Sequence, residues 1–116
     1  MSARHIIFVY GSLRKGKPQH ALLSDARFLG EAMTRPVFTL VDTGAWPAAT
    51  LTGQTAIAGE VYAVSAKRLA ALDAYEQHPF LFRRSRVVLA DNREAWMWVY
   101  ISEINPHWRL LESGCW

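Results

Sequence analysis

Short apolar runs, some alternating with polar residues, recur along the chain, and their lengths and patterns are typical of β-strands. Glycine, proline, asparagine and aspartate separate most of these runs, as expected for turns. The predicted strands span residues 5–10, 36–42, 57–64, 82–89 and 96–101. Two further segments are less regular. We expect a short helix running into a strand over residues 20–29, and a loop or irregular hairpin over residues 43–53.

One segment has the pattern of an α-helix. Ser65 is a suitable N-cap for a helix over residues 66–76, and Pro79 lies just beyond its end. Leu69 and Leu72 mark the apolar face of this helix. Because most strands follow one another through short connections, the pattern predicts one mostly antiparallel α+β domain over residues 1–116, arranged as a closed barrel.

Composition agrees with a single globular domain. The chain has 116 residues, of which 51% are hydrophobic and 20% charged. No apolar run approaches the roughly 18 residues of a membrane span, and the first apolar run is too short for a signal-peptide core. The single cysteine, Cys115, excludes an internal disulfide. These features predict a cytoplasmic protein that does not bind membranes.

The first loop resembles a phosphate-binding loop in spacing only. Gly11, Gly16 and Lys17 fit the pattern G-x-x-x-x-G-K, but Pro18 stands where a magnesium-binding Ser or Thr is required. The net charge of +3 and two short basic groups do not indicate a nucleic-acid partner. A Gly-Ser turn at a strand end can instead present N–H groups to a carboxylate or an oxyanion. The alternative is an ordinary tight turn.

Glu76 is the most unusual charged residue in the sequence. Its position on the predicted helix places it on the same face as Leu69 and Leu72, at the helix C-terminus. Burial and the helix dipole would both raise its pKa, as a general base near neutral pH requires. In the alternative arrangement, Glu76 turns into solvent or pairs with an arginine of residues 83–86. Asp73, at the edge of this face, is expected to be a solvated or capping residue.

The remaining reactive side chains give weaker signals. His5, His20, His78 and His107 show no metal-ligand spacing, so we expect no metal site. Cys115 has no basic neighbour in the sequence and is not expected to act as a nucleophile.

Several short segments form motifs in a fixed order along the chain. Residues 9–13 are Val-Tyr-Gly-Ser-Leu, residues 59–62 are Gly-Glu-Val-Tyr, and residues 72–76 have the pattern L-D-x-x-E. Together they resemble the Y-G-S-L signature, the G-E-(apolar)-Y strand and the L-D-x-x-E segment of the gamma-glutamylcyclotransferase-like superfamily, which includes AIG2-like proteins. Tyr100 falls where the family has a tyrosine on its last main strand, and residues 111–116 resemble the ending of small bacterial members.

This resemblance implies a small β-barrel with flanking helices and a cavity at its mouth. It implies a small-molecule gamma-glutamyl substrate held by Tyr10, Gly11, Ser12 and Leu13, with Tyr100 as a further binding residue. Glu76 would act as general base and then acid in closing 5-oxoproline, without metal or cofactor.

Phe82 departs from the family pattern, in which many members have tyrosine at this position. The missing hydroxyl leaves open a second interpretation, a non-catalytic module that binds a small amino-acid-like ligand.

Overall fold

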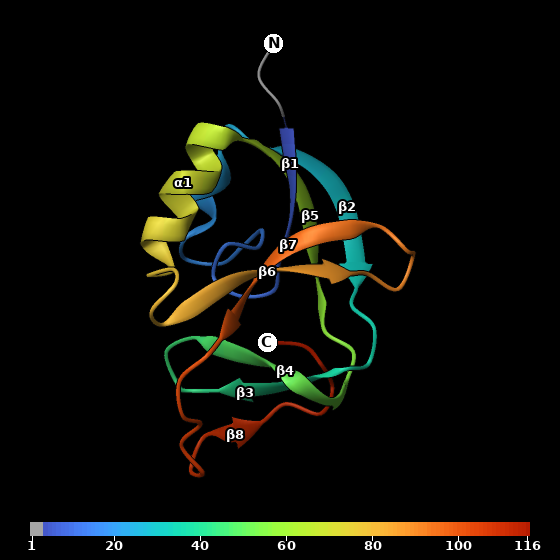
Figure 1. Cartoon of the computed structure of the whole chain (residues 1–116), viewed down its shortest axis with the longest axis vertical. Coiled ribbons are helices and arrows are strands. Elements are labelled where there is room, and N and C mark those ends of the chain that lie inside the picture. The colour runs from blue at the N-terminus through green and yellow to red at the C-terminus, as the bar shows by residue number, and fades with distance from the viewer. Residues whose placement is uncertain (1–3) are drawn as a thin grey trace.

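The computed structural model describes residues 4–116 and consists of two β-sheets and one α-helix (Figure 1). The larger sheet has the strand order β2-β5-β1-β7-β6 and the smaller one the order β4-β3-β8. The strands of the larger sheet are β1 (Arg4–Val9), β2 (Arg27–Met33), β5 (Ala58–Ser65), β6 (Phe82–Val88) and β7 (Glu94–Tyr100). Those of the smaller sheet are β3 (Phe38–Asp42), β4 (Pro47–Thr55) and β8 (Arg109–Leu110). The helices are α1 (Ala66–Tyr75) and the 3₁₀-helix η1 (His20–Leu23).

The central strand β1 organises the larger sheet. It pairs antiparallel with β5 and parallel with β7, so that Ile7 lies opposite Tyr62 on one side and Trp96 on the other. All other strand pairs are antiparallel. The predicted mostly antiparallel α+β fold is therefore confirmed, and the five strands expected from their patterns are all present.

The expected closed barrel is wrong for the described residues. Strands β2 and β6 remain the two edges of the larger sheet. They approach each other only through one bridge, between Thr34 and Leu89, just beyond their ends. A single bridge does not make the continuous ladder that closes a barrel.

Residues 47–55 differ most from the prediction, because they form the nine-residue strand β4 rather than the loop or short irregular hairpin expected over residues 43–53. Gly53 is a turn signal in the sequence, but here it allows two backbones to approach closely. A Cβ atom at this position would lie 2.3 Å from the Phe38 carbonyl oxygen. The sequence pattern predicts no element after residue 101, but Arg109 and Leu110 form β8 and pair with β3. Residues 20–29 contain the expected short helix followed by a strand.

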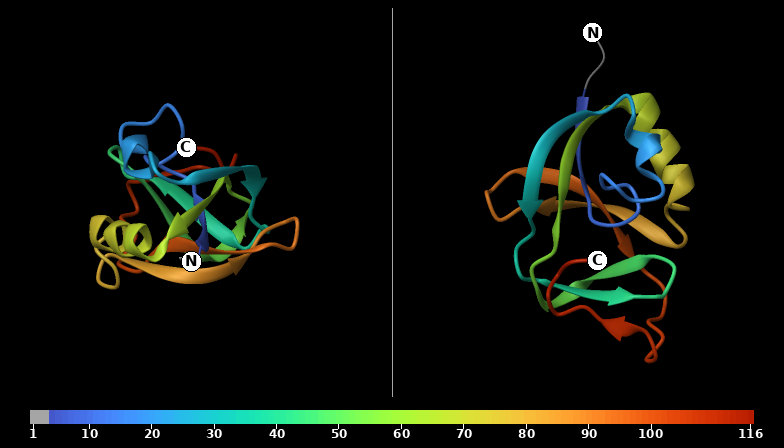
Figure 2. Two further views of the ribbon diagram at one scale, coloured as in Figure 1. Left: turned by 90° about the horizontal axis from the view of Figure 1, so that it is seen from above. Right: turned by 180° about the vertical axis from the view of Figure 1, so that it is seen from behind.

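The side chains of β1 alternate between two apolar clusters. Ile7 and Val9 belong to the cluster that contains Leu69 and Leu72 of α1. Phe8 belongs to the other cluster, with Phe38 and Leu40 of β3. In Figure 2 (right), α1 lies beside the loop that follows β1. The core therefore fixes the end of β1, the end of α1 and the smaller sheet relative to one another. None of the described helices is long and apolar enough to cross a membrane.

Candidate active site

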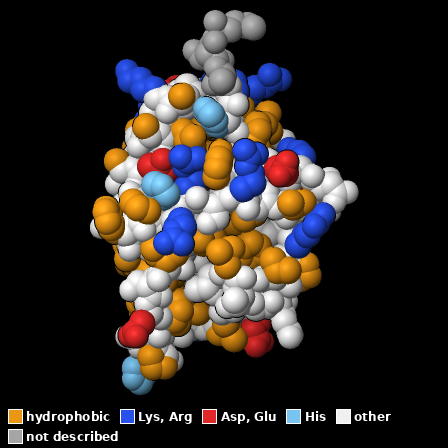
Figure 3. Space-filling view, in the orientation of Figure 1, with side chains coloured by type: hydrophobic (Ala, Val, Ile, Leu, Met, Phe, Trp, Pro, Cys, Tyr) orange, Lys and Arg blue, Asp and Glu red, His pale blue; other side chains and the backbone are white. Residues whose placement is uncertain are grey.

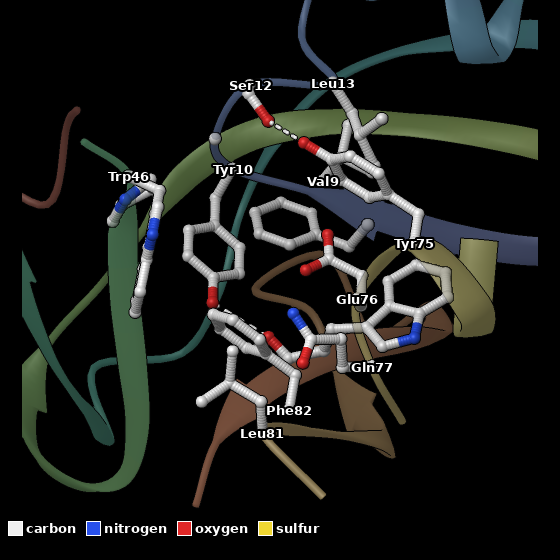
Figure 4. Close-up of a pocket in the computed structure, with 14 residues that line it drawn as sticks. Val9, Tyr10, Ser12, Leu13, Trp46, Tyr75, Glu76, Gln77, Leu81 and Phe82 are labelled. Atoms are coloured by element: carbon white, nitrogen blue, oxygen red, sulfur yellow. Dashed lines mark hydrogen bonds between the residues drawn. The ribbon is translucent and has the colours of Figure 1, made fainter. Parts of the chain in front are cut away.

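A cavity of about 230 Å³ opens where β1 ends, between the end of α1, the start of β4 and the start of β6 (Figure 4). Most of its wall is apolar or aromatic. The lining residues are Phe8, Val9, Tyr10, Gly11, Ser12, Leu13, Trp46, Pro47, Tyr75, Glu76, Gln77, Leu81, Phe82 and Trp98. Of the residues predicted to form the site, the structure therefore brings together Glu76 and the whole Tyr10–Leu13 segment.

The loop after β1 lines this cavity and has backbone donors without a partner in the described part of the chain. The carbonyl groups of Gly11 and Ser12 accept hydrogen bonds from the N–H groups of Arg14 (3.1 Å) and Gln19 (2.9 Å). Within residues 4–116, the N–H groups of Gly11, Ser12 and Leu13 donate to no other residue. Consecutive free N–H groups form a concave site for an anion such as a carboxylate. The Ser12 Oγ and the Tyr75 Oη lie 3.0 Å apart at the same end (Figure 4).

Gly11 is required by close packing. A Cβ atom at this position would lie 2.8 Å from Cγ of Pro47, the buried first residue of β4. The loop can follow this path only because residue 11 has no side chain.

The end of α1 places Glu76 on the side of the cavity opposite the loop. Ser65 caps the helix start as predicted, accepting a hydrogen bond from the Arg68 N–H at 3.1 Å. The helix stops one residue earlier than expected, with Glu76 as its C-cap. The N–H of Gln77 donates to Ala74 (3.2 Å) and that of His78 to Asp73 (2.9 Å), which is the Schellman pattern. Gln77 adopts the left-handed conformation that this pattern needs (φ 57°).

The Glu76 carboxyl group is half-buried and accepts no hydrogen bond from residues 4–116. Removal from water disfavours its charged form, and burial raises the pKa of Glu76 to about 7. Neither alternative arrangement is observed, since Glu76 is not fully exposed and, within residues 4–116, no arginine of residues 83–86 pairs with it. A carboxyl group with this pKa exists in both protonation states near neutral pH, as acid–base catalysis requires.

Asp73 is neither the solvated nor the capping residue that the pattern suggested. Its Oδ1 accepts hydrogen bonds from the Arg84 Nε and from the Trp98 Nε1, both at 2.9 Å. The ion pair is mostly shielded from solvent. Asp73 thus joins α1 to β6 and β7, and this contact occupies Arg84, one of the arginines considered as a partner for Glu76.

The two tyrosines predicted to bind substrate are placed differently. The buried Tyr10 hydroxyl donates to the Trp98 carbonyl at 2.8 Å and accepts from the Ala49 N–H at 3.3 Å. Burial and then the nearby Glu76 charge raise the Tyr10 pKa, so the phenol stays neutral. Tyr10 therefore contributes a ring to the wall. Tyr100 does not line the cavity, because it packs behind Phe82 and Trp46, with ring centroids 5.5 and 5.7 Å away.

The basic loop residues point to aromatic rings and not to a phosphate site. The Lys15 Nζ lies 3.4 Å from the Phe28 ring centroid, and the Lys17 Nζ lies 4.8 Å from that of Trp116. Lysine and arginine side chains are scattered over the face shown in Figure 3. Among residues 4–116, no three His, Cys, Asp or Glu side chains come close enough to hold a metal ion.

Comparison with known proteins places this arrangement in a family. The model of the gamma-glutamyl cyclotransferase, AIG2-like family matches residues 7–116. The chain belongs to this family.

Three similar proteins match between 76% and 97% of this chain. A Vibrio cholerae relative is 36% identical over 113 residues, covering 97% of this chain and 96% of the relative. Human gamma-glutamylaminecyclotransferase is 34% identical over 99 residues, covering 76% of this chain and 65% of the human protein. The crystal structure of a mouse AIG2-like protein superimposes with a TM-score of 0.85 at 26% identity, covering 97% of this chain and 88% of the mouse chain.

Several residues of the cavity wall were not recognised in the sequence as site residues, among them Trp46, Tyr75, Gln77 and Leu81. Tyr75 lies inside the family-like segment 72–76, directly before Glu76. Its position beside Glu76 could have indicated that it is a site residue. Trp46 lies in the segment expected to be irregular. Its position depends on pairing between β3 and β4, which no local pattern revealed.

The raised pKa of Glu76 has a consequence for stability. The folded pKa of about 7 exceeds the ordinary value of 4.5, so folding favours the protonated Glu76 carboxyl group. The resulting contribution to the free energy of unfolding is complete below pH 4.5 and is lost as the pH rises through 7. Glu76→Gln should therefore increase the free energy of unfolding by about 2 kcal/mol at pH 8, and by much less at pH 5. Urea unfolding at both pH values measures this. An equal effect at both would contradict the assigned burial.

Proposed function

We propose that this protein is a gamma-glutamylcyclotransferase, which converts a gamma-glutamyl amine or gamma-glutamyl amino acid to 5-oxoproline and the free amine or amino acid. The observation that carries the proposal is the position of Glu76. A half-buried carboxyl group with a pKa of about 7 faces the same cavity as the free N–H groups of Gly11, Ser12 and Leu13. One group can move a proton, and the other can hold the substrate beside it.

The loop supplies the binding of the glutamyl part. Its three N–H groups match the α-carboxylate of a gamma-glutamyl compound, an anion that requires several donors. The hydroxyls of Ser12 and Tyr75 can hydrogen-bond either the carboxylate or the α-amino group. With the carboxylate held at the loop, the α-amino group is directed toward Glu76.

The chemistry then needs only one protein group. The Glu76 carboxylate takes a proton from the α-ammonium group, and the freed amine attacks the γ-carbonyl carbon of the same molecule. A five-membered lactam forms as the new C–N bond closes and the attacking nitrogen loses a second proton to solvent. Glu76 returns the first proton to the departing nitrogen as the original amide bond breaks. Because nucleophile and carbonyl belong to one molecule, holding them in a reactive conformation supplies much of the rate acceleration.

The pH dependence of the rate follows from this mechanism. Only the Glu76 carboxylate can accept the proton, so kcat/KM should rise about tenfold per pH unit below 7 and level off above it. Initial rates with one gamma-glutamyl substrate between pH 5 and 8 measure the profile. A flat profile over this range would exclude a base with the pKa of Glu76.

The decisive experiment is a panel of gamma-glutamyl amines and amino acids incubated with the purified protein, with 5-oxoproline quantified by mass spectrometry. The proposal predicts 5-oxoproline from at least one member. The alternative, a binding module whose Phe82 lacks the family hydroxyl, predicts saturable calorimetric binding without product. Absence of product across a panel that binds would favour that module.

A further inference from the structure

The cavity has two ends of different chemistry, and Glu76 lies between them (Figure 4). At one end are the free N–H groups of the loop with the hydroxyls of Ser12 and Tyr75. At the other end are the side chains of Trp46, Leu81 and Phe82. A gamma-glutamyl head bound at the polar end extends its amide past Glu76, so the leaving group lies against the apolar end.

The apolar end is a rigid aromatic wall. The Trp46 ring packs edge-on against Phe82 (centroids 5.5 Å apart) and Trp108 (6.1 Å). Its backbone is held from Thr43, whose hydroxyl donates to the Trp46 carbonyl at 2.8 Å and accepts from the Trp46 N–H at 3.1 Å. A surface fixed in this way favours a flat or branched apolar group, because little side-chain freedom is lost on contact.

Among the described residues 4–116, the cavity lining includes one carboxyl group, that of Glu76, and no lysine, arginine or histidine. Arg84, close to Glu76 in sequence, is held by Asp73 at 2.9 Å. A carboxylate on the leaving group would therefore lie against an apolar wall without a cationic partner and near a like charge. Both effects disfavour its binding.

Resting on the proposed function, we propose that the substrate's leaving group is an apolar or aromatic primary amine without a carboxylate, and that Trp46 selects it. The reaction is unchanged, with the amide C–N bond breaking and the proton passing to the nitrogen of this amine. Gamma-glutamyl amino acids, which retain an α-carboxylate at this end, are the substrates that the wall rejects.

A matched pair of substrates tests the selection. Gamma-glutamyl-phenethylamine and gamma-glutamyl-phenylalanine differ only in the carboxylate of the leaving group. We expect kcat/KM for 5-oxoproline release to be about 100-fold higher for the phenethylamine compound, since an unpaired buried polar group discriminates strongly. Equal values, or a preference for gamma-glutamyl-phenylalanine, would overturn the inference while leaving the proposed function intact.

Variants of the wall separate selection from general damage. Trp46→Ala should lower kcat/KM for gamma-glutamyl-phenethylamine about 20-fold, but for gamma-glutamyl-methylamine less than about 3-fold, because a methyl group makes little contact with the ring. Leu51→Ala, an exposed apolar residue on β4 outside the cavity lining, is the matched control and should change neither value. Equal losses on both substrates with Trp46→Ala would contradict a role in selection.

A binding measurement tests the site without the chemistry. Glutaryl-phenethylamide and glutaryl-phenylalanine keep the terminal carboxylate but lack the α-amine, so neither can cyclise. Calorimetry should show about 30-fold tighter binding of the phenethylamide. If this ranking holds but no gamma-glutamyl compound yields 5-oxoproline, the selective site stands and the proposed function fails. If 5-oxoproline forms but the ranking is absent, the function stands and the selective site is wrong.

Discussion

Replacing Glu76 by glutamine should reduce 5-oxoproline release by about 10³-fold while leaving the fold unchanged, because the amide is nearly isosteric but cannot accept the proton. The Glu76 side chain forms no hydrogen bond within residues 4–116, so its replacement disrupts no contact of the scaffold. Steady-state kinetics with the best substrate of the panel measures the loss, and circular dichroism checks the fold.

The matched control is Glu94→Gln, which makes the same chemical change at an exposed site on β7. Its kcat should equal that of the unmodified protein. A Glu76→Gln variant that kept a tenth or more of the activity would show that another group moves the proton.

Adding one methyl group to the loop should have the second-largest effect. Gly11→Ala forces the new Cβ to within 2.8 Å of Pro47, so the loop must shift by several tenths of an ångström or more. The N–H groups of Ser12 and Leu13 then no longer meet the substrate carboxylate in the required geometry. We expect kcat/KM to fall about 100-fold, as displacements of this kind do in precisely aligned sites.

A second substitution distinguishes this steric effect from other causes. Pro47→Ala removes the Cγ and Cδ atoms that the new methyl group would meet. The double variant Gly11→Ala/Pro47→Ala should therefore have a kcat/KM at least tenfold higher than that of Gly11→Ala. Pro47→Ala alone should not raise kcat/KM above that of the unmodified protein. A double variant as impaired as Gly11→Ala alone would mean that the loop fails for reasons other than contact with Pro47.

Local patterns were sufficient for most of the fold. The apolar run in β1 and the Ser65 cap of α1 predicted their elements because these signals lie within a few neighbouring residues. Strand β4 was missed because its Gly53 and Pro47 are turn formers in isolation, and its pairing with β3 depends on contacts across the chain. The prediction of a closed barrel was wrong for a similar reason, since the twist of the whole sheet decides whether two edge strands meet.

The candidate site was predictable where chemistry and position coincide in one segment. Glu76 stood out because an acidic residue on an apolar helix face is rare, and the Gly-Ser turn because it ends a buried strand. The wall formed by Trp46 was not predictable, since its contacts with Phe82 and Trp108 join residues far apart in sequence. Tyr100 was assigned to the site from its family position, but the structure places it behind that wall.

The central claim is that the substrate's own amine attacks its γ-carbonyl with Glu76 as the base. The most direct test is a reaction in H₂¹⁸O with gamma-glutamyl-phenethylamine, followed by mass spectrometry of the acidic product. The mechanism predicts 5-oxoproline without ¹⁸O, because water takes no part in breaking the amide bond. Glutamate carrying one ¹⁸O atom in its γ-carboxylate would show hydrolysis by water instead, and would contradict the mechanism assigned to Glu76.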